Sequence, residues 1–101
     1  MTPNDVQRAI DKRTLLPGED PGSLILEDAV HWISVYGELL TFKRSMLEAA
    51  SNAMKSMTKD ATRDVDIDQQ LLRAQARRYV ARQEFWVQRL AELEGEPPPD
   101  S

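Results

Sequence analysis

The fold is decided by residues 29–57, which read AVHWISVYGELLTFKRSMLEAASNAMKSM. Apolar side chains recur in this stretch at alternating steps of four and three residues, the spacing of a heptad seam on one helix face. The seam positions are Ala29, Ile33, Tyr36, Leu40, Leu47, Ala50, Met54 and Met57, with Lys43 in the one polar slot. No proline interrupts residues 23–57, and Ser23 is the expected N-cap. The pattern therefore predicts one long helix.

A second seam follows in the C-terminal part of the chain. Its positions are Val65, Gln69, Leu72, Ala76, Tyr79, Gln83, Trp86, Leu90 and Leu93. Asp66 and Gln69 resemble a capping box, so we expect the helix to begin near Asp66 and to run to about Glu94, with Gly95 in the C′ position. Residues 58–66 then form the connector, and the chain reverses near residue 62. Two helices of similar length joined in this way predict an antiparallel hairpin.

The sequence before this hairpin predicts a short helix followed by an irregular arm. Thr2, Pro3 and Asp5 suit the first turn of a helix that ends near Arg13. Prolines and glycines then punctuate the chain up to Gly22. We therefore divide the chain into a helix and arm at 1–22, a long hairpin at 23–95 and a disordered, acidic, proline-rich tail at 96–101. The predicted fold class is all-α: an antiparallel two-helix hairpin with a short N-terminal helix and arm.

The length and composition of the chain exclude several classes of protein. A chain of 101 residues holds one domain, and the absence of cysteine excludes a disulfide scaffold, a thiolate zinc site and thiol catalysis. No apolar run approaches the roughly 18 residues of a membrane helix, and the N-terminus lacks the apolar core of a signal peptide. We therefore expect a soluble, cytoplasmic protein without membrane contact.

The apolar stripes of both helices are wider than one helix–helix contact requires. Leaving a large apolar side chain in water forfeits about 1.5–3 kcal/mol, and two hairpins that pair into a four-helix bundle remove that cost. We therefore expect a homodimer, and in the alternative the stripe binds a different protein. The candidate interface residues are Trp32, Tyr36, Phe42, Met46, Tyr79, Val80, Trp86 and Val87.

Positive charge is concentrated in the second long helix. Residues 69–89 contain five arginines against Glu84 alone, although the whole chain has a net charge of −4. Two pairs spaced four residues apart present a surface that can hold phosphate or a nucleotide: Arg73, Arg77, Arg78 and Arg82. In the alternative these arginines pair across the bundle with acids of the first helix: Glu27, Asp28, Glu38 and Glu48. The net negative charge argues against nucleic-acid binding.

Catalytic and metal-binding patterns are absent from the sequence. His31 is the only histidine, and no Glu-x-x-His motif or glycine-rich phosphate loop accompanies it. We expect no catalytic residue, no metal and no cofactor, and hence no enzyme. Lys43, Gln69 and Gln83 are polar residues at seam positions; we interpret them as devices that fix helix register, with a ligand pocket as the alternative.

The segments EDAVHWISVYGELLTFK (27–43) and RQEFWVQRL (82–90) resemble small uncharacterised helical proteins of actinobacteria. The resemblance covers most of residues 23–94 and implies no activity. In outline the hairpin is also similar to actinobacterial anti-sigma factors that bind cyclic di-GMP between antiparallel helices. Their signature is absent, because Arg73 and Arg78 are each followed four residues later by Arg where that family has Gln, and no site residues are carried over.

Two functions follow from these observations. The first is a non-enzymatic protein–protein interaction or regulatory module built on a dimeric helical hairpin. The second is a nucleotide or small-ligand sensor that uses the arginine-rich face of the second long helix.

Overall fold

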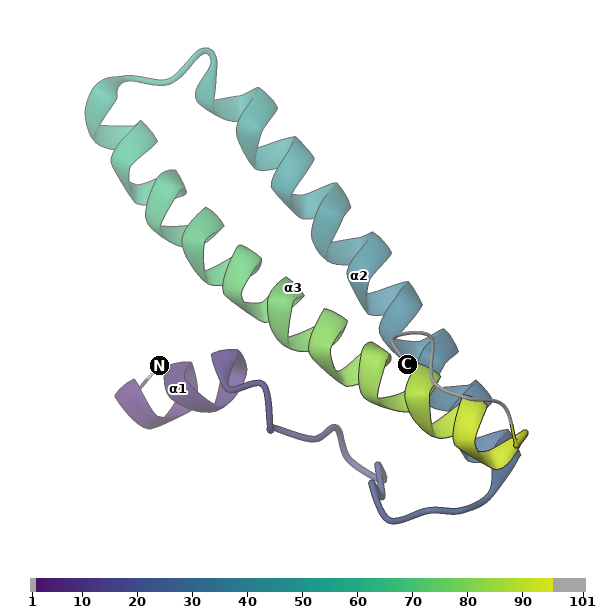
Figure 1. The fold of residues 1–101 in the computed structure, drawn as a ribbon. Coiled ribbons are helices and arrows are strands. Elements are labelled where there is room, and N and C mark those ends of the chain that lie inside the picture. Colours follow the sequence, from purple (N-terminus) through teal and green to yellow (C-terminus); the bar gives the residue numbers. More distant parts are fainter. Residues whose placement is uncertain (1, 96–101) are drawn as a thin grey trace.

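The chain forms three helices, shown in a computed structural model that describes residues 2–95 (Figure 1). They are α1 (Pro3–Ile10), α2 (Leu26–Met54) and α3 (Lys59–Leu93), and the described residues contain no strand. The long helices α2 and α3 lie antiparallel, and α1 packs on α3 alone. The predicted all-α hairpin with an N-terminal helix and arm is thus confirmed. The tail at 96–101 lies outside the described residues.

The two heptad seams meet to form the core. The fully or nearly buried apolar residues all belong to predicted seam positions: Ala29, Tyr36, Leu40, Tyr79 and Trp86. Trp86 and Tyr36 are its largest fully buried side chains. The buried aromatic residues therefore gather in the part of the hairpin away from the turn.

Two glutamines at seam positions donate hydrogen bonds across the hairpin. Gln69 donates from Nε2 to Ser51 Oγ at 2.8 Å, and Gln83 donates from Nε2 to the carbonyl of Ile33 at 3.1 Å. A Cβ on Gly37 would lie 3.3 Å from Gln83 Nε2, so the missing side chain lets this amide lie against α2. These contacts support the interpretation of Gln69 and Gln83 as register-fixing residues.

The predicted connector at 58–66 is wrong. The turn occupies residues 55–58, and α3 already begins at Lys59, with the Thr58 hydroxyl accepting a hydrogen bond from the Ala61 amide at 3.3 Å. The polar residues that suggested a connector lie mostly on the exposed surface of the first turns of α3. The chain therefore reverses before residue 62, and Gln69 lies beside Ser51.

Two helix boundaries also differ from the sequence prediction. The N-cap of α2 is Ile25 and not Ser23; the Ser23 hydroxyl lies two residues before the cap and donates to Asp28 Oδ2 at 2.6 Å. At the other boundary, α1 ends at Ile10 and not near Arg13, since Asp11 leaves the helical conformation. The Thr2–Asp5 capping box that opens α1 and the positive φ of Gly95 after α3 both agree with prediction.

Candidate functional site

A buried carboxylate joins the arm to the hairpin; we define the arm as residues 11–25. Glu19 follows Gly18, and its side chain enters the end of the hairpin where the aromatic residues gather. Arg82 donates to Glu19 Oε2 from Nε at 3.1 Å and from its terminal nitrogen at 2.8 Å. Trp86 Nε1 donates to the same oxygen at 2.7 Å, while Tyr36 Oη and the Leu16 amide donate to Oε1. One side chain of the arm thus contacts both long helices.

The environment of Glu19 keeps it ionised. Burial by itself favours the neutral acid, but the hydrogen bonds from Tyr36, Leu16, Trp86 and Arg82 outweigh burial and hold the pKa of Glu19 below its usual value. Burial, followed by the hydrogen bond to Glu19 and its charge, raises the pKa of Tyr36. The site is therefore a carboxylate–guanidinium pair completed by neutral donors. These additional hydrogen bonds offset the desolvation penalty of burying the ion pair.

Two further arginines of α3 hold the arm and α1 through backbone carbonyls. Arg78 donates to the carbonyl oxygens of Ala9 at 2.8 Å and Arg8 at 3.3 Å, at the C-terminal end of α1 where a positive charge is favourable. Arg89 donates to the carbonyl of Ser23 at 2.7 Å. Three arginines of α3, spaced along one side of the helix, thus bind the N-terminal segment of the same chain.

This arrangement corrects the sequence prediction for the arginine-rich face. Arg78 and Arg82 are buried and bind the chain's own N-terminal segment, so they are not open anion contacts. Arg73 and Arg77 are exposed and make no ion pair with residues 2–95. None of the ion pairs within that range involves the alternative partners Glu27, Asp28, Glu38 and Glu48; Arg82 pairs with Glu19 of the arm.

The candidate interface residues divide into a buried and an exposed group. Tyr36, Tyr79 and Trp86 pack inside the hairpin, so the prediction that these three residues contact a partner is corrected. Trp32 is half-buried against the same core, and its assignment to an interface stays a prediction. The remaining four candidates are exposed: Phe42, Met46, Val80 and Val87. Helix periodicity assigned all eight to broad stripes, but it did not show that the hairpin itself buries the aromatic part.

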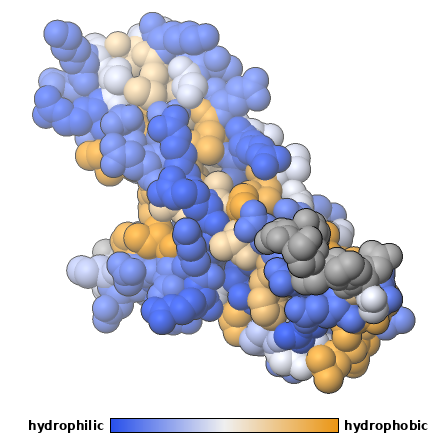
Figure 2. All heavy atoms as spheres, in the orientation of Figure 1, coloured by the Kyte–Doolittle hydropathy of each residue, from blue (hydrophilic) through white to orange (hydrophobic). Residues whose placement is uncertain are grey.

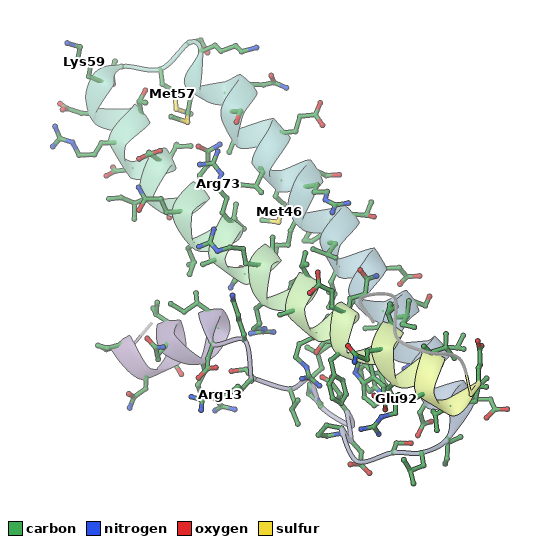
Figure 3. All side chains as sticks on the ribbon, in the orientation of Figure 1. Arg13, Met46, Met57, Lys59, Arg73 and Glu92 are labelled. Carbon is green, nitrogen blue, oxygen red and sulfur yellow. The ribbon has the colours of Figure 1, made fainter. Side chains whose placement is uncertain are left out.

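The exposed candidates of α2, Phe42 and Met46, lie one helical turn apart in the half of the helix that leads to the turn. We call the apolar area around them the turn-end surface and define it as Phe42, Met46, Leu71 and Leu72. Phe42 is 61% exposed. Met46 and Leu71 line a cavity of about 350 Å³ together with Ala50, Val65, Asp68 and Leu72. Figure 3 places Met46 between the two long helices, and Figure 2 shows apolar atoms exposed between strongly polar edges.

The other polar residues noted in the sequence lie apart from these sites. His31 is exposed, with its ring against Trp32 at a centroid distance of 4.8 Å. Within residues 2–95, no three side chains of the metal-ligating types His, Cys, Asp and Glu converge on one point. None of the helices described in that range is long and apolar enough to cross a bilayer.

Glu19 is the buried residue of this site that sequence reasoning missed. It stands in a proline- and glycine-rich loop, where an acid is ordinarily solvated. The available signal was on α3, where Arg82 and Trp86 are one helical turn apart and both need a buried hydrogen-bond partner. Leu16, three residues before Glu19, packs against the core, so the loop that contains Glu19 lies close to the hairpin.

Comparison with known proteins gives no relative on which to base a function. No protein-family model matches the chain, and neither the curated proteins nor the solved structures provide a match.

Proposed function

We propose that the protein is a non-enzymatic protein–protein interaction module that works as a dimer of helical hairpins. The observation that carries the proposal is the turn-end surface, because Phe42 is 61% exposed and Met46, one turn further along α2, lines an apolar cavity with Leu71 and Leu72 of α3. Large apolar side chains grouped in this way mark sites of protein association. A second copy offers an equal apolar surface, and pairing the two copies builds a four-helix bundle.

The position of the arm supports this choice of surface. The arm binds the hairpin at the end away from the turn, through Glu19 and Arg82. Near the turn no segment of residues 2–25 makes a comparable contact, and the apolar side chains there stay in water. A partner hairpin at the turn-end surface supplies the cover that the arm supplies at the other end.

The charge of this surface also favours an apolar partner. Asp68 is the only charged residue that lines its cavity, and the arginines of α3 that bind the arm lie further along the helix. The nucleotide-sensor alternative keeps only Arg73 and Arg77, since Arg78 and Arg82 are buried against the N-terminal segment.

Light scattering coupled to size-exclusion chromatography tests the proposal. We expect the wild-type chain to elute as a dimer and Phe42→Asp to elute as a folded monomer, because a carboxylate at this place opposes apolar association. Leu24→Asp is the matched control, since Leu24 is 74% exposed but lies in the arm. A monomeric wild type, or a Phe42→Asp variant that stays dimeric, contradicts the proposal.

A further inference from the structure

A second cavity lies where the arm, α2 and α3 meet. Its volume is about 300 Å³, at the lower end of the range of small-molecule sites. The floor is apolar and consists of Leu40 from α2 and Ala76, Val80 and Ala81 from α3. This cavity shares no residue with the cavity of the turn-end surface.

Three cationic side chains from three different segments surround the apolar floor. They are Lys12 of the arm, Arg44 of α2 and Arg77 of α3. None of them forms an ion pair with residues 2–95, where the pairs involve Arg13, Arg82 and Arg89. Glu84 is the one acid on the wall, so three positive charges face one negative charge. The unbalanced charge is complementary to an anion.

The fold brings these cations together by specific contacts. Arg78 holds the last carbonyls of α1, and Lys12 follows α1 by two residues, so this contact places Lys12 beside α3. Lys43 is the neighbour of Arg44 in the chain, and its pKa is lowered, first by burial and then by the positive charge of Arg78. Positive charge thus exceeds negative charge around the middle of the hairpin.

The geometry points to a binding site for a small amphipathic anion, a short apolar body that carries one carboxylate or phosphate group. The apolar body occupies the floor around Val80, and the anionic group meets Lys12, Arg44 and Arg77. Glu84 repels the anion and directs it toward the cationic side of the cavity. The site is independent of the turn-end surface, and its occupation does not require a dimer.

Isothermal titration calorimetry with three probes of equal chain length tests the site. We expect octanoate and octyl phosphate to bind, and the ratio of their affinities shows which head group fits better. We expect 1-octanol, which lacks the charge, to bind at least about tenfold more weakly. The affinity of the anionic probes falls with added salt. If neither anion binds, or if 1-octanol binds as tightly as the anions, the inference is wrong.

Charge-changing variants locate the site. Arg77→Gln weakens the binding of the anionic probes about fivefold, which is the effect of losing one partly exposed charge contact. Glu84→Gln strengthens binding, because it removes the repelling charge. Arg73→Gln is the matched control: Arg73 is an exposed arginine one turn away that does not line the cavity. Equal affinity for wild type and Arg77→Gln, with unchanged melting temperatures, places the probes elsewhere and overturns the inference.

Discussion

Trp86 and Glu19 are joined by a hydrogen bond of 2.7 Å from the indole Nε1 to the carboxylate Oε2, across 67 positions of the chain. The same oxygen accepts from Arg82, so the largest side chain of the core and a buried cation depend on one residue of the arm. Packing and ionic pairing are therefore not separate features of this fold. A change at Glu19 affects both the attachment of the arm and the environment of the core tryptophan.

Replacing the carboxylate tests this dependence directly. Glu19→Gln leaves Arg82 buried without a counter-charge, and we expect it to lower the free energy of unfolding by about 3 kcal/mol. This decrease in the free energy of unfolding cannot exceed the free energy with which the arm docks on the hairpin. If the arm detaches, Arg82 becomes solvated and no longer carries an unpaired buried charge. Urea unfolding followed by tryptophan fluorescence measures the change, and limited proteolysis of residues 11–25 reports arm release.

An exposed acid provides the control for this variant. Glu27→Gln changes an exposed residue near the start of α2 and should alter the free energy of unfolding by less than about 0.5 kcal/mol. If Glu19→Gln behaves like Glu27→Gln, the buried carboxylate does not hold the arm.

The Glu19 pair also makes stability depend on pH. The pKa of Glu19 is lower in the folded chain than its ordinary value of 4.5, so its contribution is complete above pH 4.5 and is lost as pH falls through the folded pKa. The stability difference between wild type and Glu19→Gln should therefore shrink on acidification. Urea unfolding of both proteins over an acidic pH series measures this; a difference that stays constant contradicts it.

Tyr36 gives the opposite dependence at alkaline pH. Its pKa in the folded chain lies above the ordinary value of 10.0, so its contribution is complete below pH 10 and is lost as pH rises through the folded pKa. We expect Tyr36→Phe to remove this alkaline loss while leaving the acidic transition of Glu19 in place. Unfolding at alkaline pH, with wild type and Tyr36→Phe compared at each point, separates the two groups.

The register between α2 and α3 is a further feature open to test. Gln69 is 3% exposed and bonded to Ser51, whereas its neighbour Gln70 is exposed and bonds within its own helix to Asp66. We expect Gln69→Ala to cost about 1–3 kcal/mol, since it removes a buried hydrogen bond and side-chain volume. Gln70→Ala should change the free energy of unfolding by less than about 0.5 kcal/mol. Equal effects in thermal or urea unfolding contradict a role for Gln69 in register.

The sequence predicts the hairpin well because heptad periodicity is a local pattern that each helix carries by itself. Trp86 and Tyr36 could be placed on seams for that reason. The start of α3 could not, because Thr58 caps the helix only after the turn at residues 55–58 is known, and a polar first turn looks like a connector. Glu19 could not be assigned, since its partners on α2 and α3 meet only when the arm folds back. Arg82 was recognised as a candidate anion contact; its actual anion is part of the same chain.

The last prediction concerns α1, which depends on Arg78. An isolated helix of eight residues is unstable in water, and α1 contains no buried residue. Arg78→Met keeps much of the apolar stem and removes the donors to Ala9 and Arg8. We therefore expect the amide hydrogens of residues 6–10 to exchange nearly as fast as in an unfolded chain. The Glu19–Arg82 contact remains, and amides of the α3 segment around Trp86 stay protected. Hydrogen exchange measured by NMR resolves both regions in one experiment. Arg77→Met is the control on the exposed neighbour, and retained protection of α1 in Arg78→Met shows that its apolar face alone holds it to α3.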